Sequence, residues 1–208
     1  PFDILAFHLP IRLERMPMEE TRRAIDEIAA CGYNLLFLGL GGANRAAYEV
    51  STLGQVDFFG ASHGDMAELV SYVRDSGMEP VIAVHIVGKQ AHVVGKLARQ
   101  YPGLMSEGAE REKGIVNHRF RFPDGRTAQE ALVENVIDQM LALYGDRQPR
   151  YFLIANDEMP VDPMAEFGAA EGMTAADFFA DAINQSADHL LNKGVTPILF
   201  SDMLLSKK

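Results

Sequence analysis

The chain has 208 residues, of which 48% are apolar and 23% charged, a composition typical of folded globular proteins. Its 29 acidic and 19 basic residues give a net charge of −10, which disfavours nucleic acids and anionic membrane surfaces as partners. No apolar run approaches the ~20 residues that a membrane-spanning helix needs. Cys31 is the only cysteine, which excludes an intramolecular disulfide and a thiolate zinc cluster, and we expect it to be a small buried side chain.

The sequence leaves the location of the protein open. A chain without disulfides fits the cytoplasm. It fits equally a secreted or periplasmic protein after signal removal, because no charged segment leads into an apolar stretch after Pro1. Predicted strands lie close to both ends, and we expect the chain to be cut at both.

Short apolar segments alternate with amphipathic segments of helical period. The apolar segments predict five strands, over 3–9, 34–40, 79–87, 150–155 and 196–200. Helices are expected over 18–30, 64–76, 91–100, 127–143 and 174–193, and Thr127 and Glu130 have the spacing of a capping box. Residues 105–126 are polar and irregular, and a connection of this length is often functional.

This alternation predicts a parallel sheet with right-handed crossovers, which a doubly wound sheet and a barrel both satisfy. No strand precedes the G-x-G-x-x-G turn of a dinucleotide-binding fold, because Leu38-Gly39-Leu40-Gly41-Gly42 lacks that spacing. Reactive side chains instead gather just after several strands. We therefore predict an α/β fold, a TIM (β/α)₈-type barrel with about the first five β/α units present, as one partial catalytic domain over 1–208.

Candidate site residues stand at the predicted C-terminal ends of strands, which converge on one face of a barrel. His8 is expected after the first strand and His85 at the end of the third, with His92 a few residues beyond it. Asp202 follows the fifth strand. A lone histidine at a strand end is more often structural, so the joint placement of these residues on one face is the informative observation.

The sharpest signal is Asn156-Asp157-Glu158, three polar residues that end an apolar strand. Two adjacent carboxylates repel, and burial raises the cost further. One of them is therefore expected to keep its proton near neutral pH and to act as a general acid. The alternative is a turn in which Asp157 caps the chain and Pro160 breaks it.

Four segments, in order along nearly the whole chain, resemble glycoside hydrolase family 20, the β-N-acetylhexosaminidases. Asp157-Glu158 resembles the family's Asp-Glu pair after the fourth barrel strand. The other three matches are Gly32-Tyr33-Asn34-Leu35-Leu36-Phe37 after Ile25-Asp26, His92 with Tyr101-Pro102-Gly103-Leu104, and Phe200-Ser201-Asp202-Met203, which resembles a Trp-x-Asp motif.

Other positions depart from the family pattern. Ala155 and Asn156 replace the two glycines before the Asp-Glu pair, and His85 stands where the family usually has Glu. The sugar-gripping Arg of the first strand has no clear equivalent in 2–8, and the chain contains no Trp. The chain therefore resembles a divergent and truncated relative, for which a different sugar or a loss of activity is an open alternative.

The resemblance implies a substrate-assisted, retaining hydrolysis of terminal N-acetylhexosamine residues. The substrate's own 2-acetamido oxygen attacks the anomeric carbon, and Glu158 protonates the leaving oxygen and then deprotonates water. Asp157 holds the acetamide N–H and stabilises the developing charge. We expect the carbohydrate substrate to be bound by His92, Asp202, Asn156, His85 and His8. No metal or cofactor is expected.

Two other functions stay open at this point. His8, His85, Asp157, Glu158 and Asp202 offer nitrogen and oxygen ligands, so a metal-dependent sugar isomerase or hydrolase barrel is the alternative enzyme, although no His-x-His pair follows the first strand. A catalytically inactive carbohydrate-binding barrel is the alternative without chemistry.

Five strands cannot close an eight-stranded barrel, and the first and fifth would expose unpaired backbone. Apolar side chains expected to face the barrel interior would then meet water; these are Ile4, Leu36, Ile82, Ile154 and Leu199. We therefore expect either a missing C-terminal half of the barrel or a homo-oligomer that covers the edges.

Overall fold

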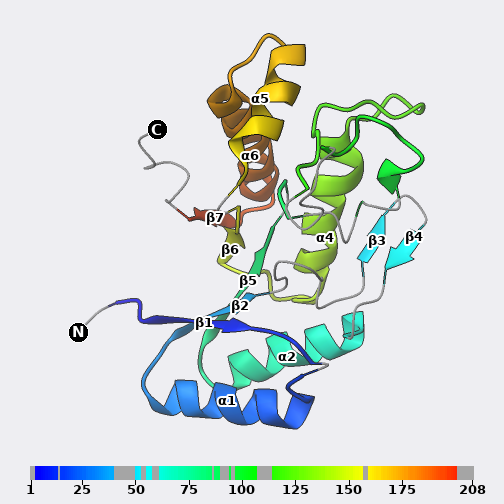
Figure 1. The fold of residues 1–208 in the computed structure, drawn as a ribbon. Coiled ribbons are helices and arrows are strands. Elements are labelled where there is room, and N and C mark those ends of the chain that lie inside the picture. Colours follow the sequence, from blue (N-terminus) through cyan, green and yellow to red (C-terminus); the bar gives the residue numbers. More distant parts are fainter. Residues whose placement is uncertain are drawn as a thin grey trace.

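The computed structural model describes residues 3–13, 15–39, 50–52, 55–57, 61–85, 87–89, 94, 97–106, 114–156 and 159–200. The main sheet contains β1 (Ala6–Pro10), β2 (Leu35–Gly39), β5 (Glu79–Val84), β6 (Tyr151–Ile154) and β7 (Thr196–Leu199), whereas β3 (Val50–Thr52) and β4 (Gln55–Asp57) form a separate antiparallel pair. The helices are α1 (Met18–Ala30), α2 (His63–Asp75), the π-helical turn η2 (Gln129–Val133), α4 (Glu134–Ala142), α5 (Val161–Ala170) and α6 (Ala175–Asn192) (Figure 1).

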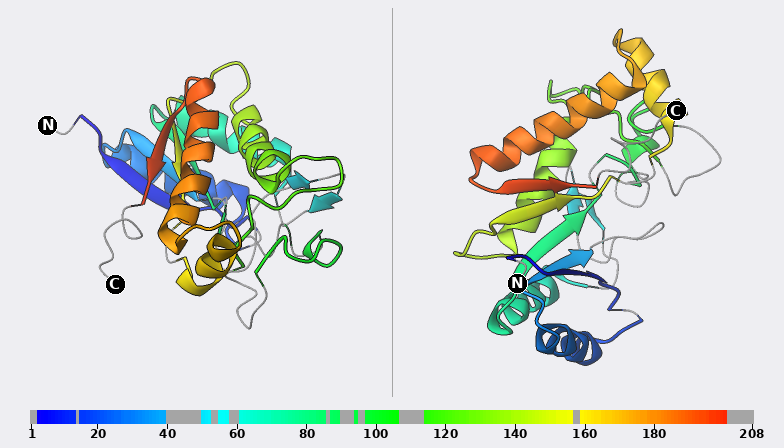
Figure 2. Two further views of the ribbon diagram at one scale, coloured as in Figure 1. Left: turned by 90° about the horizontal axis from the view of Figure 1, so that it is seen from above. Right: turned by 90° about the vertical axis from the view of Figure 1, so that its left-hand side faces the viewer.

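The five strands of the main sheet are all parallel and run in the order β1-β2-β5-β6-β7. Each strand therefore pairs with the next one along the chain, apart from the short β3–β4 pair. A doubly wound sheet reverses its order at a switch point, and this sheet does not. The predicted α/β fold with five parallel strands is confirmed, and Figure 2 shows the strands fanning out in sequence order.

Helices cover one face of this sheet, and the main hydrophobic core lies between them and the strands. Leu36, Ile82 and Phe152 are fully buried there, in one cluster with Ile25 of α1, Leu69 of α2 and further residues of α4 and α6. Alternation along a strand sends every second side chain to this face. The helices thus bury this side of the three central strands.

The opposite face carries a second, smaller cluster made only of strand residues. Its buried members are Leu35, Val81, Ala83, Leu153 and Ala155, with Phe37, Tyr151 and Ile198 packed against them. The expectation that Leu36, Ile82, Ile154 and Leu199 face away from the helices is therefore wrong. The first three belong to the helix-side core, and Leu199 pairs in register with Ile154. An assignment that is one residue out moves every side chain of a strand to the other face.

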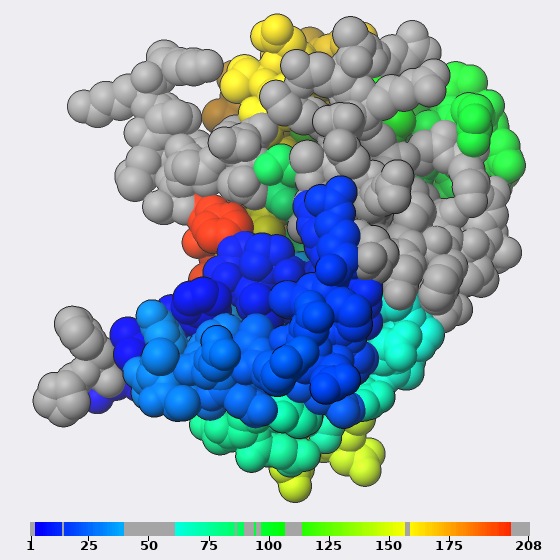
Figure 3. Space-filling view, turned by 60° about the horizontal axis from the view of Figure 1, so that its bottom comes forward, coloured from blue at the N-terminus to red at the C-terminus, as the bar shows by residue number. Residues whose placement is uncertain are grey.

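Both edges of the sheet are strands with exposed apolar side chains. Phe7 in β1 is 38% exposed and Leu199 in β7 is 37% exposed. Ile4 and Leu5 before β1 and Phe200 after β7 are also exposed. Figure 3 shows the dark blue chain around β1 and the red end of β7 both on the molecular surface.

Tyr144, just beyond α4, forms hydrogen bonds with the first half of β5, where β6 does not pair with that strand. Its hydroxyl accepts a hydrogen bond from the N–H of Ile82 at 2.8 Å and donates to the carbonyl of Pro80 at 3.1 Å. Strand β6 pairs with β5 only further along, where Ala83 lies opposite Leu153. Burial raises the pKa of Tyr144, so the hydroxyl stays protonated.

Several boundaries and elements differ from the expectations. Helix α5 and the β3–β4 pair were not predicted, and Cys31, expected to be buried, is exposed at the end of α1.

The capping box at Thr127 is confirmed: the Thr127 N–H donates to Glu130 Oε2 at 2.7 Å, and the Glu130 N–H donates to Thr127 Oγ1 at 3.2 Å. Within the described part of the chain, no helix is long and apolar enough to cross a membrane.

Candidate functional site

The ends of β5 and β6 are tied together at the C-terminal edge of the sheet. The N–H of Ala155 donates to the carbonyl of Val84 at 3.0 Å and so continues the pairing beyond β6. Next in the chain, Asn156 is only 4% exposed, and its Oδ1 accepts from the N–H of Val87 at 3.4 Å. The side chain of Asn156 thus joins the segment after β6 to the segment after β5.

Gly88 and Met159 form a second contact between the same two segments. Both are buried, and a Cβ placed on Gly88 would overlap the sulfur of Met159. A side chain at position 88 would therefore force the end of the Met159 side chain to move. Asn156 and Met159 flank Asp157-Glu158 in sequence, so the residue on each side of the acidic pair contacts Val87 or Gly88.

Four of the predicted site residues lie outside the described residues: Asp157, Glu158, His92 and Asp202. Their roles stay predictions. Strand β6 ends at Ile154, three residues before Asp157, and β7 ends at Leu199, three residues before Asp202.

His8 lies in the middle of β1, and not after it as expected, and it is exposed. It pairs in register with Phe37, so its side chain is on the helix-free face. Its Nε2 lies over Gly39, where an added Cβ would come within 2.6 Å of that atom. Glycine at position 39 therefore leaves room for the imidazole.

His85 follows β5 directly and is half-buried. Strand alternation places it on the same side as Ala83, which is the helix-free face. Register puts His8 level with Val81, four residues before His85, a separation of about 13 Å along the strand direction. The structure brings the two histidines to one face but not into contact.

No group of three or more His, Cys, Asp or Glu residues that could hold a metal ion occurs within the described ranges. The ligand set of the metal-dependent alternative included Asp157, Glu158 and Asp202, which lie outside those ranges. That alternative therefore stays a hypothesis.

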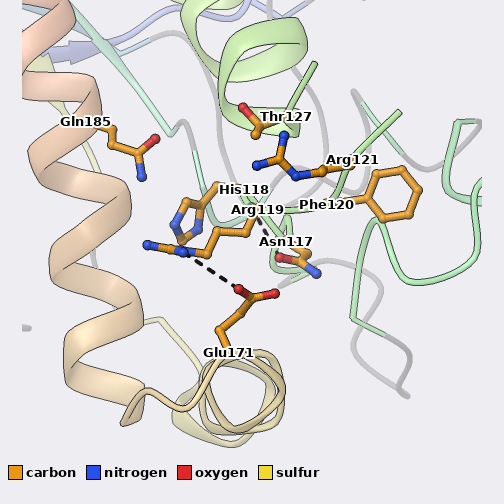
Figure 4. A pocket seen from close by; sticks show the side chains of 8 residues that line it. All are labelled: Asn117, His118, Arg119, Phe120, Arg121, Thr127, Glu171 and Gln185. Carbon is orange, nitrogen blue, oxygen red and sulfur yellow. Dashed lines mark hydrogen bonds and ion pairs between the residues drawn. The ribbon is translucent and has the colours of Figure 1, made fainter. Parts of the chain in front are cut away.

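Sequence reasoning missed a polar cluster that joins the long connection after β5 to α6. Nε2 of the fully buried His118 lies 2.7 Å from Asp181 Oδ2, and Arg119 Nε donates to the same oxygen at 2.8 Å. Gln185 Nε2 donates to it at 2.9 Å, and Arg119 also lies 3.6 Å from Glu171 (Figure 4). The one available signal was the polar, irregular stretch that contains His118 and Arg119.

Charge in this cluster is concentrated on Asp181 and Arg119. Burial disfavours the ionised form of Asp181, but hydrogen bonds from Arg119, His118 and Gln185 outweigh it and lower the pKa of Asp181 to about 2. Burial lowers the pKa of His118 in spite of the nearby carboxylate. Arg119 already balances Asp181, so a neutral His118 that donates its Nε2 proton fits the cluster.

Two isolated β-bridges lie within the long connection, and one hydrogen bond joins it to the segment after β5. Met105 bridges to Val116, whose N–H donates to the carbonyl of Val87 at 2.8 Å. Arg121 bridges to Thr127 just before η2. The connection therefore starts beside the Asn156 and Met159 contacts and ends against α6.

No family model and no curated protein matches the sequence. Among solved structures, a β-N-acetylhexosaminidase from Bacteroides fragilis is similar with a TM-score of 0.72 at 17% identity, over 97% of this chain and 41% of that chain. The tandem GH20 catalytic modules of the pneumococcal exo-β-D-N-acetylglucosaminidase are similar with a TM-score of 0.69 at 13% identity, over 95% of this chain and 53% of that chain.

A third similar structure is the GH20 β-N-acetylhexosaminidase from Streptomyces coelicolor, with a TM-score of 0.66 at 17% identity, over 97% of this chain and 40% of that chain. The chain thus spans about half the length of the solved structures it matches, or less. At this identity the likeness is one of fold. The chain has the fold of part of these family 20 proteins, in agreement with the resemblance in sequence.

Proposed function

We propose that this chain forms the first five β/α units of a (β/α)₈ barrel glycosidase that removes terminal N-acetylhexosamine residues. One observation supports the proposal most. Asp157-Glu158 follows β6, the fourth strand of the main sheet, and the family carries its Asp-Glu pair after its fourth barrel strand. The likeness in fold to family 20 structures over 95–97% of the chain supports the same alignment.

In the proposed mechanism the substrate supplies the nucleophile. Its 2-acetamido oxygen attacks the anomeric carbon while Glu158 donates a proton to the leaving glycosidic oxygen. Asp157 accepts the acetamide N–H and stabilises the positive charge that develops on the ring closed by this attack. Glu158 then removes a proton from the water that opens the ring, which leaves the anomeric configuration retained.

The described residues would act mainly by placing this pair. Asn156 uses its Oδ1 to accept from the N–H of Val87, which favours a positioning role for it beside any contact with a sugar hydroxyl. His8 and His85 stand on the helix-free face, where a barrel would enclose them. His92 and Asp202 complete the proposed substrate-binding set. Catalysis of this type depends on placing groups to within a fraction of an ångström, so the anchors matter as much as the acids.

We further propose that additional β/α units, or a second copy of the chain, cover β1 and β7. Edge strands with unpaired backbone and exposed apolar side chains are sites of association. Phe7 and Leu199 present such side chains on the two edges. In a closed barrel the same surfaces would pair with the missing strands.

A pair of chromogenic substrates tests the proposal. The full-length protein is expected to hydrolyse 4-nitrophenyl N-acetyl-β-D-glucosaminide and to be inhibited by a thiazoline analogue of the cyclised intermediate. The matching 4-nitrophenyl β-D-glucoside lacks the acetamide nucleophile and should be hydrolysed far more slowly. Equal rates on both substrates would contradict the mechanism, and sugar binding without turnover would favour the inactive barrel.

A further inference from the structure

Lys89, shortly after β5, has a strained backbone conformation. Its φ is 55°, in the left-handed region, where the Cβ of an L-residue approaches the following carbonyl oxygen. Among the described residues, every other one with a positive φ is a glycine, which adopts this conformation without a steric penalty. Strained residues persist where the surrounding structure holds them, and they are concentrated at functional sites. A function of the side chain would explain why position 89 is not a glycine.

The two residues before Lys89 are held by contacts on more than one side. The N–H of Val87 donates to Asn156 Oδ1 at 3.4 Å, and its carbonyl accepts a backbone hydrogen bond from the long connection at 2.8 Å. Gly88 packs against the sulfur of Met159. Lys89 follows directly and is half-buried. Its conformation therefore belongs to a segment with little freedom to rearrange.

These contacts bring the segment that carries Lys89 to the acidic pair. Asn156 stands directly before Asp157-Glu158 and Met159 directly after it, and consecutive Cα atoms are only about 3.8 Å apart. Each acid is thus one residue from a contact with this segment, and Lys89 is one residue from Gly88. The flexible four-carbon stem of a lysine is long enough to bridge such a separation.

The proposed reaction needs one negative charge and one proton on the acidic pair. Adjacent carboxylates titrate as a coupled pair, and a cation within about 4–6 Å favours their ionised forms. The chain carries a net charge of −10, which opposes the ionisation of a further carboxyl group. A positive group beside the pair therefore keeps one carboxylate charged down to a lower pH.

We propose that Lys89 is a positioning residue for the acidic pair: its ammonium group lies beside Asp157-Glu158 and keeps one of the two carboxylates ionised. The inference rests on the proposed function for the catalytic role of the pair. Lysine carries its positive charge throughout the range in which carboxylates titrate. The strained conformation at position 89 is retained because it directs the ammonium group towards the two acids.

Further titratable and charged groups lie on this segment and on the elements around it. They are His85 on the same segment, His8 in β1, His118 and Arg119 of the long connection, Glu171 at the end of α5, and Asp181 in α6. A substitution at position 89 leaves all of them in place, so their titration contributes to the wild type and the variant alike. A difference between the two pH profiles therefore reports on the side chain of Lys89.

The pH dependence of kcat/KM on 4-nitrophenyl N-acetyl-β-D-glucosaminide tests the inference in the full-length protein. Loss of the charge in Lys89→Met should move the acid limb to higher pH by about one unit, whereas Lys89→Arg should keep the wild-type limb. Lys193→Met removes a lysine that pairs with Asp138 after α6, and as the matched control it should leave the profile unchanged. An unmoved acid limb in Lys89→Met, or the same shift in Lys89→Arg, would overturn the inference.

Lys89→Gly separates the charge from the backbone strain. Glycine adopts the left-handed region freely, so this variant should unfold at a higher urea concentration than Lys89→Met and still show the same shifted acid limb. A wild-type pH profile in Lys89→Gly would show that the side chain does not act on the pair.

A second measurement does not depend on turnover. NMR titration of the carboxyl carbons, assigned with Asp157→Asn and Glu158→Gln, gives the apparent pKa values of the pair. The lower value should rise by about one unit in Lys89→Met. That rise in a protein that never hydrolyses the aryl glycoside would support the inference and reject the proposed reaction. An unchanged value would overturn the inference even in an active enzyme.

Discussion

Nε2 of His118 lies 2.7 Å from Oδ2 of Asp181, and this contact joins two segments that are 63 residues apart in the chain. His118 belongs to the long connection after β5, and Asp181 to the first half of α6. The ring of His118 also packs on Phe178, with centroids 4.4 Å apart. The contact therefore joins the long connection to α6.

The first prediction concerns the pH dependence of stability at His118 and Asp181. The pKa of His118 is lowered in the folded protein. Below about pH 6.5 the unfolded chain therefore binds more protons than the folded one, and the free energy of unfolding decreases as the pH is lowered. Asp181, whose pKa is lowered to about 2, loses its contribution at lower pH, between about 4 and 2. Urea unfolding of the wild type and His118→Gln at pH 7 and pH 5 measures the first step.

The difference in unfolding free energy between the wild type and His118→Gln should shrink at pH 5. A difference that grows on acidification would mean that folding raises the pKa of His118, and it would contradict a neutral, buried imidazole at this position. Asp181→Ala removes the oxygen that accepts from three donors and should cost about 1–3 kcal/mol at pH 7.

The second prediction concerns Gly88. An added methyl group would overlap the sulfur of Met159, so Gly88→Ala should displace Met159 and the acidic pair that precedes it. We expect activity to fall by about 10–100-fold, because small misplacements of catalytic groups are costly. Steady-state kinetics on the aryl N-acetylglucosaminide is the measurement.

Two companion variants make the Gly88 test specific. Gly64→Ala adds a Cβ whose nearest neighbour is Ser62 Oγ at an ordinary 3.5 Å, so its kinetics should match the wild type. A smaller residue at position 159 in the Gly88→Ala background should restore part of the lost rate. Full activity in Gly88→Ala alone would show that the contact does not position the pair.

The third prediction concerns Tyr144. Tyr144→Phe leaves the N–H of Ile82 and the carbonyl of Pro80 without their partner in a buried strand. The loss should be about 2–3 kcal/mol in unfolding free energy, measured by denaturant titration. Tyr72→Phe removes an exposed hydroxyl that bonds Asp26 and should cost clearly less, so equal losses in the two variants would contradict this explanation.

The sequence allowed the five parallel strands and the long helices to be predicted, because apolar runs and helical periodicity are local signals. It did not show which side of a strand faces the helices: Leu36 and Ile82 lie on the helix side, opposite to the expectation. Continuous apolar runs conceal the period of two, since both faces of such a strand are buried. Helix α5 was not predicted because Pro163 and Gly168 interrupt a short segment.

The candidate site, like the fold, could be predicted from the sequence only in part. Polar residues after apolar strands were visible in the sequence, and Asn156 lies at the end of β6 as expected. The ties that fix its surroundings, from Val87 to Asn156 and from Gly88 to Met159, depend on tertiary contacts between segments about 70 residues apart. The partnership of His118 with Asp181 has the same origin, and neither residue carries a local signal for it.

The turnover rate of Glu158→Gln on 4-nitrophenyl N-acetyl-β-D-glucosaminide tests the central claim most directly. Removing a general acid should lower kcat by about 10²–10⁴-fold with the fold intact. Glu166→Gln, an exposed acid on α5, is the matched control and should keep wild-type kcat. A folded Glu158→Gln protein with wild-type kcat would contradict the assignment of Glu158 and, with it, the proposed mechanism.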